Sequence, residues 1–101
     1  MAYRYLASMK AKPGRREEVV AILLQTATAL REAGCERYLV SVANADDVTI
    51  WVSERWRSKE AHDASLQLPE AQAAIERVRP MLTGEFTGQE LTLRGGLGAE
   101  P

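Results

Sequence analysis

The spacing of hydrophobic residues along this chain changes several times, and that succession of spacings most constrains its fold. Residues 2–11 alternate loosely between two faces, as a β-strand does, until Pro13 and Gly14 interrupt the pattern. Over residues 15–33 the apolar positions recur every three to four residues, which is typical of a helix buried along one side. Gly34 then stands where a helix commonly ends in a left-handed residue.

The second half of the chain predicts a hairpin, two short helices and a last strand. Strands are expected over 35–43 and 48–57, separated by an Asn/Asp turn. Ser58 is a suitable N-cap for a helix that ends near residue 66. Pro69 suits the first turn of a further helix that ends before Pro80. The last strand is expected over 86–93, with a glycine weakening its middle.

The resulting order, β-α-β-β-α-β with the second helix broken near Pro69, predicts an α+β fold of the ferredoxin-like class. In this class an antiparallel sheet carries its helices on one face. A chain of 101 residues has room for one domain. We assign that domain to residues 1–93 and expect the glycine-rich residues 94–101 to form a flexible C-terminal tail.

Apolar side chains are expected on both faces of this sheet. Trp51 and Trp56 lie five residues apart on one strand, so they point to opposite faces. Tyr3, Tyr5 and Met9 add apolar groups on the first strand. Because a face in contact with water should be polar, we expect the face opposite the helices to be covered by the same sheet of a second copy. The prediction is a homodimer.

Composition excludes several classes of function. Thirteen basic and fourteen acidic residues give a net charge of −1, which argues against a nucleic-acid partner. One cysteine and one histidine cannot form a Cys/His zinc site or an internal disulfide. No apolar run approaches the ~20 residues that cross a bilayer, and the first residues lack a secretory signal. We therefore expect a cytoplasmic protein with no membrane partner.

The residues best suited to chemistry lie between 51 and 69. His62 is the only histidine, and an imidazole can take up or release a proton near neutral pH. In a pocket it could accept a phenolic proton, whereas on an exposed helix face it would have no such role. His62, Asp63 and Ser65 are not expected to form a hydrolase triad, because sequence neighbours on a helix do not face one another.

Aromatic residues near this histidine could bind a flat ligand. Of Trp51 and Trp56, one should line a pocket on the helix side and the other the interface between sheets. The hydroxyl of Tyr38 could hold a phenolic oxygen. All three could equally serve as packing.

Glu54 shares a face with Trp56 and needs a partner if it is buried. An unpaired charge in the interior is costly, so we expect a structural ion pair with Arg37 or Arg57. Cys35 follows the helix-ending glycine and is expected to be a small packed thiol.

The Lys-Pro-Gly turn at 12–14, the hairpin and the segment E-R-W-R-S-K-E-A at 54–61 resemble the antibiotic biosynthesis monooxygenase superfamily. The resemblance covers residues 3–93. It implies a dimeric α/β barrel, in which two protomers pack sheet against sheet and each keeps a pocket between its sheet and helices. It also implies oxidation of flat phenolic or aromatic small molecules, of the anthrone or quinol type, by O₂ without metal or other cofactor.

The resemblance further implies roles for individual residues. His62 would be the catalytic residue that assists deprotonation of the substrate, although the family commonly places a histidine where this chain has Ser65. Trp56, Tyr38, Trp51 and Ser65 would bind the substrate. Residues 2–11 lack the asparagine of haem-degrading relatives, which disfavours haem. The expected function is a cofactor-independent monooxygenase; a non-catalytic ligand-binding dimer and a structural dimerisation module are the alternatives.

Overall fold

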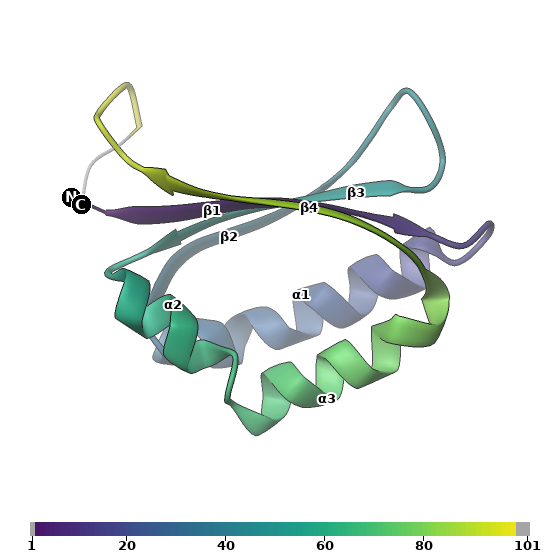
Figure 1. Cartoon of the computed structure of the whole chain (residues 1–101), viewed down its shortest axis with the longest axis horizontal. Helices are drawn as coiled ribbons and strands as arrows, with labels where there is room; N and C mark the ends of the chain where they lie inside the picture. The colour runs from purple at the N-terminus through teal and green to yellow at the C-terminus, as the bar shows by residue number, and fades with distance from the viewer. Residues whose placement is uncertain (1, 99–101) are drawn as a thin grey trace.

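The computed structural model describes residues 2–98 as one four-stranded antiparallel sheet with helices on one face (Figure 1). The elements in chain order are β1 (Tyr3–Ala11), α1 (Arg16–Glu32), β2 (Cys35–Val42), β3 (Thr49–Trp56), α2 (Lys59–Ser65), α3 (Pro69–Val78), a 3-10 turn (Arg79–Met81) and β4 (Leu82–Thr92). The predicted α+β, ferredoxin-like fold class is confirmed. Within the described residues, no helix is both long and apolar enough to cross a membrane.

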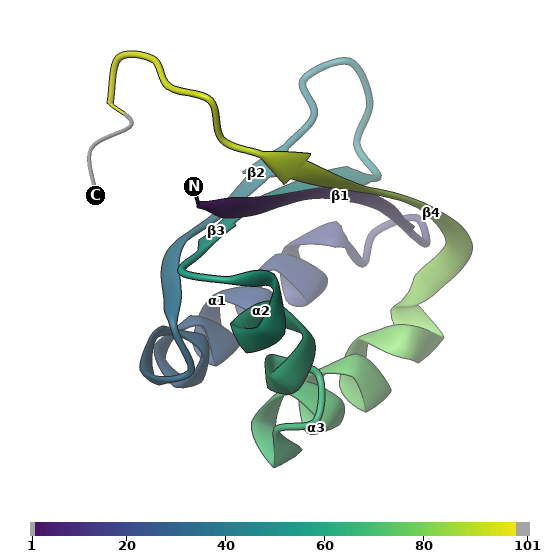
Figure 2. The ribbon, with the colours of Figure 1, turned by 60° about the vertical axis from the view of Figure 1, so that its left-hand side comes forward.

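The strands lie side by side in the order β2-β3-β1-β4, and every neighbouring pair is antiparallel. Figure 2 shows α1, α2 and α3 on the same side of this sheet. The sheet curves over the helices, so that α2 lies under one end and the last turn of α3 under the other (Figures 1 and 2). This curvature turns the concave face of the sheet toward the helices.

The helix ends follow the local signals in the sequence. Gly34, just beyond the end of α1, has a φ of +108°, a conformation that costs glycine little. Ser58 caps α2 by accepting a hydrogen bond from the Ala61 main-chain N–H at 3.0 Å. Pro69 is the first residue of α3. The expected N-cap, helix end and proline position are therefore confirmed.

The last strand begins earlier than predicted. It was expected from residue 86, whereas β4 runs from Leu82 and pairs with β1 as far as Ala11. Two irregularities permit this extension: Gly84 has a φ of +94°, and the register between the strands shifts after Met9. The pairing partner, rather than the local sequence, determines where β4 begins.

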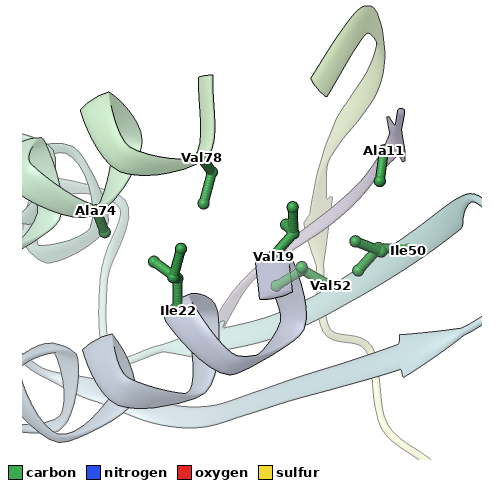
Figure 3. Close-up of a cluster of buried hydrophobic side chains, with 7 residues drawn as sticks. All are labelled: Ala11, Val19, Ile22, Ile50, Val52, Ala74 and Val78. Carbon is green, nitrogen blue, oxygen red and sulfur yellow. The ribbon is translucent and has the colours of Figure 1, made fainter. Parts of the chain in front are cut away.

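The main hydrophobic core fills one half of the space beneath the sheet. Its buried residues come from β1, α1, β3 and α3, and Figure 3 shows them directed toward one another: Ala11, Val19, Ile22, Ile50, Val52, Ala74 and Val78. A second buried cluster consists of Leu30, Cys35 and Trp56 at the other half. The cysteine is buried, as expected. Each large aliphatic side chain removed from water stabilises the fold by roughly 1.5–3 kcal/mol.

The opposite face of the sheet carries exposed apolar side chains. Leu39, Trp51 and Leu91 alternate with inward-facing neighbours and have exposed fractions of 52%, 41% and 37%. Of the residues named for the two faces, Tyr3, Tyr5 and Met9 pack on the helix side. Trp51 lies on the opposite face, so the expectation of apolar groups on both faces is confirmed.

Residues 94–98 belong to no helix or strand. Residues 99–101 of the predicted tail lie outside the described part, so its flexibility stays a prediction.

Candidate functional site

A cavity of about 220 Å³ lies between the sheet and the three helices. The sheet contributes aromatic and acidic side chains, and α2 contributes a histidine and a serine: Tyr5, Tyr38, Glu54, Trp56, His62 and Ser65. Aliphatic side chains of α1 and α3 close the remainder of the wall. The cavity therefore has an apolar lining with a few polar groups, which is the usual composition of a small-molecule site.

His62 lies inside this cavity rather than on the surface. Its exposed fraction is 8%, and its ring centroid lies 5.0 Å from that of Tyr5, 5.2 Å from Tyr3 and 5.5 Å from Trp56. The Tyr5 ring is stacked on the imidazole, and the Trp56 ring meets it edge-on. Ser65 is also buried, because residues three apart share one face of a helix. The alternative of a solvent-facing histidine is wrong.

Asp63 contacts the imidazole of His62 directly. The distance from His62 Nδ1 to Asp63 Oδ1 is 3.0 Å, which contradicts the expectation that these neighbours would not meet. The side chains turn toward each other at the rim, where the Asp63 carboxylate stays exposed. Its hydrogen bonds with His62 and Lys59 lower the pKa of Asp63. The Ser65 hydroxyl donates instead to the main-chain oxygen of His62 at 2.6 Å, so no hydrolase triad forms.

A network of charged groups holds α2 against the sheet edge. Lys59 Nζ lies 3.2 Å from Asp63 Oδ2 and 2.8 Å from Glu90 Oε1. The Tyr3 hydroxyl donates to the same Glu90 oxygen at 2.9 Å. These contacts join α2 to both β1 and β4 beside the imidazole, and therefore limit how far His62 can move.

Glu54 and Trp56 form a hydrogen-bonded pair at the top of the cavity. The fully buried Trp56 donates its indole Nε1–H to Glu54 Oε1 at 2.8 Å. The predicted ion pair of Glu54 with an arginine is wrong, because among the described residues its hydrogen-bond partner is this indole. Arg37 follows the strand alternation to the opposite face, and Arg57 lies beyond the end of β3. Burial raises the pKa of Glu54, with the indole hydrogen bond and His62 acting in the opposite direction.

Tyr38, Glu54 and Tyr5 form a row across three neighbouring strands. The strand register places Glu54 directly opposite Tyr38 on one side and Tyr5 on the other. The Tyr38 hydroxyl and the second oxygen of Glu54 form no hydrogen bond within residues 2–98, and no polar side-chain atom described there is buried without a partner. Both oxygens are therefore accessible, and their residues line the cavity. Burial raises the pKa of Tyr38, which keeps its hydroxyl protonated.

The position of the Tyr5 ring depends on a glycine of the neighbouring strand β4. A Cβ at Gly88 would overlap the Tyr5 hydroxyl, so the ring can stack on His62 only because residue 88 is a glycine. The sequence did not indicate Gly88 as part of the site. The pattern that could have indicated it is the pairing of β1 with β4, which no local signal specifies.

The structure brings together four of the five residues predicted for the site. His62, Trp56, Tyr38 and Ser65 line the cavity. Trp51 does not, because alternation along β3 directs it to the opposite face, where it is 41% exposed. Its assignment as a substrate-binding residue is therefore not supported for this cavity. Over residues 2–98, no three histidine, cysteine, aspartate or glutamate side chains are grouped to hold a metal ion.

Comparison with known proteins identifies the family. The sequence pattern of the family called antibiotic biosynthesis monooxygenase matches residues 2–77. A crystal structure of a protein named for this family, from Chloroflexus aurantiacus J-10-fl, is 35% identical, covers 97% of this chain and 100% of its own, and has a TM-score of 0.80.

More distant structures share the fold. Rv0793 from Mycobacterium tuberculosis is 21% identical, with 96% of this chain and 99% of that chain covered and a TM-score of 0.83. A Nitrosomonas europaea protein named for the same family is 15% identical, with 99% and 94% covered and a TM-score of 0.85. No curated protein matches. From the family match and the 35% identical relative, we conclude that this chain belongs to the antibiotic biosynthesis monooxygenase family.

Proposed function

We propose that this protein is a cofactor-independent monooxygenase that oxidises a flat phenolic molecule, of the quinol or anthrone type, with O₂. The proposal rests mainly on the position of His62. Its imidazole is buried in the cavity wall and surrounded by three aromatic rings. Its Nδ1 is hydrogen-bonded to the Asp63 carboxylate. An apolar cavity of about 220 Å³ suits an aromatic ligand. Family membership supports the reaction class.

His62 would act as the general base. When Nδ1–H donates to Asp63, Nε2 carries the lone pair and can accept a phenolic proton. The resulting phenolate is electron-rich and passes electrons to O₂. For a simple phenol, one oxygen atom forms a bond to the para carbon and the O–O bond breaks. The ring hydrogen and the phenolic proton leave with the other oxygen as water, giving a quinone. The substrate supplies all four electrons, so no external reductant is needed.

Oxygen consumption by the purified protein tests this proposal. We expect O₂ uptake with a panel of hydroquinones, naphthols and anthrones, and one ¹⁸O atom from ¹⁸O₂ in each product molecule. His62→Gln should lower the rate by about 10²–10⁴-fold, the usual contribution of a general base. Leu24→Gln, a change on the exposed side of α1, is the matched control and should keep the full rate. No uptake above that of the unfolded protein would exclude catalysis on these substrates.

A non-catalytic ligand-binding role is the second candidate. It is favoured by Ser65, which stands where the family commonly has a histidine and whose hydroxyl is engaged by the main chain of its own helix. In that case aromatic ligands would raise the melting temperature without being consumed. A purely structural role is less suited to a cavity of this volume and apolar lining.

We also infer that the protein is a homodimer joined through the outer face of the sheet. This inference is supported by the exposed apolar side chains Leu39, Trp51 and Leu91 on a face that no helix of the described chain covers.

A further inference from the structure

The cavity contains a carboxylate that the proposed reaction does not use. Glu54 lies between Tyr38 and Tyr5 in the strand register, at the centre of the sheet's contribution to the wall. Trp56 occupies one of its oxygens through the indole hydrogen bond. The second oxygen has no hydrogen-bond partner among the described residues and remains available as an acceptor.

Facing residues of two neighbouring strands therefore supply the wall with a hydrogen-bond donor and an acceptor. Tyr38 is directly opposite Glu54 across the β2–β3 pair, where facing Cβ atoms are about 4.5–5.5 Å apart. A ligand hydroxyl between them could donate to Glu54 and accept from Tyr38. A ligand that lacks the hydroxyl would leave both protein groups without partners, which is the arrangement that gives strong selectivity for a hydroxyl.

The charge of the lining acts against anionic ligands. No lysine or arginine is among the residues that line the cavity, and the row across the strands contains the Glu54 carboxyl. An aromatic carboxylate would meet that carboxyl with no lysine or arginine in the lining to neutralise either group. His62 is the one basic side chain among the lining residues, and its Nδ1 is already hydrogen-bonded to Asp63.

The volume of the cavity limits the size of the ligand. A protein cavity of about 150 Å³ accommodates benzene. A volume of about 220 Å³ is therefore matched to a ligand of one or two fused rings, which favours quinols over the three-ring anthrones among the proposed substrates.

We propose that Glu54 determines substrate specificity, by accepting a hydrogen bond from one hydroxyl of a neutral quinol of one or two rings and by excluding aromatic carboxylates. This inference rests on the proposed function and names its substrate class. Glu54 contacts one hydroxyl of the quinol in this proposal, whereas His62 removes the proton of the other hydroxyl.

Titration with a matched pair of ligands tests the proposal, with 2-naphthol as the neutral probe and 2-naphthoate as the anionic one. Binding is followed at pH 8, under anaerobic conditions, through the NMR signal of the Trp56 indole N–H, which donates to Glu54. Trp51→Phe identifies that signal, because the chain has two tryptophans. In the wild type we expect 2-naphthol to bind at least about tenfold more tightly than 2-naphthoate.

Two variants separate the role of Glu54 from general effects on the cavity. Glu54→Gln should bring the two affinities within about threefold of each other, mainly by improving the binding of 2-naphthoate. Tyr38→Phe should weaken the binding of 2-naphthol without improving that of 2-naphthoate. The same NMR spectra report whether each variant is folded.

Equal affinities in the wild type, no binding of either probe, or an unchanged ratio in a folded Glu54→Gln protein would each overturn the inference. Because oxygen is absent, the result is independent of turnover. Selective binding of 2-naphthol by a protein that consumes no O₂ would contradict only the proposed function. Turnover without selectivity would contradict only the role of Glu54.

Discussion

The pKa of Glu54 makes this residue a source of pH-dependent stability. Burial in the cavity wall raises its pKa above the usual value near 4.3, so the folded protein holds this proton more tightly than the unfolded chain does. The contribution of Glu54 to the free energy of unfolding is fully present at low pH, below the pKa that this group has in the unfolded chain. It is lost as the pH rises through the folded-state pKa, because the charged form is then buried.

Glu54→Gln should remove this pH dependence. The amide has nearly the shape of the carboxyl and can still accept from Trp56, but it carries no charge at any pH. We expect the variant to be more stable than the wild type at pH 8, and the difference to shrink as the pH falls toward 4. Urea unfolding at a series of pH values, at one protein concentration, measures this difference. Parallel pH profiles for the two proteins would show that Glu54 is not the responsible group.

At the scale of single residues, the sequence-based predictions were correct where the local structure depends only on residues nearby in the chain. Ser58, Pro69 and Gly34 each act on main-chain groups within a few residues of themselves, and the structure places all three as expected. His62 was left undecided because a seven-residue helix gives too short a pattern to show which face it turns inward. Packing of α2 against β1 and β3 decides that orientation, and the histidine enters the cavity as a result.

At the scale of elements, α1 and the β2–β3 hairpin were predicted closely because their signals are local. In the hairpin the Asp46 carboxylate accepts hydrogen bonds from the main-chain N–H groups of Val48 and Thr49, as expected of an Asp in a turn. The strand β4 was predicted too short, since its first residues are held by distant pairing with β1. Gly88, which the sequence indicated only as a weak point of that strand, proves to be the residue that makes room for Tyr5.

Gly88→Ala should therefore disturb the site from a neighbouring strand. The added methyl group overlaps the Tyr5 hydroxyl and forces the ring away from His62. We expect a loss of about 1–3 kcal/mol in the free energy of unfolding, as is typical of overpacking, together with weaker contact between the two rings in NMR spectra. Thermal unfolding measures the first effect. Gln72→Ala, on the exposed side of α3, should change stability by no more than about 0.5 kcal/mol.

A double variant identifies the cause of that loss. Tyr5→Phe removes the hydroxyl that the new methyl group would meet, so Gly88→Ala should cost clearly less in the Tyr5→Phe background. An equal cost in both backgrounds would mean that the strand conformation, and not the contact with Tyr5, makes glycine necessary at this position.

At the scale of the whole molecule, the sheet separates two surfaces for which we propose different roles. The residues that line the cavity lie on the helix side. The other face presents Leu39, Trp51 and Leu91, on three different strands, without cover from the described chain. Exposed apolar groups spread across a sheet face are typical of an interaction surface. The two roles, binding and assembly, can therefore be tested independently.

Trp51→Glu should convert the inferred dimer into a monomer and leave the cavity intact. A carboxylate in the middle of the apolar face would be buried without a partner on association, which is costly. Sedimentation equilibrium should give twice the chain mass of 11.2 kDa for the wild type and the single mass for this variant. Leu24→Glu makes a comparable change on the exposed side of α1 and should leave the dimer intact.

A wild-type protein that sediments at 11.2 kDa at every concentration would refute the dimer. The binding of 2-naphthol by the Trp51→Glu monomer then tests the separation of the two surfaces. Because the residues that line the cavity lie on the helix side of the sheet, opposite Trp51, its affinity should stay within about threefold of that of the wild type. A larger loss in a folded monomer would mean that packing of a second copy against the sheet sets the curvature on which the cavity depends.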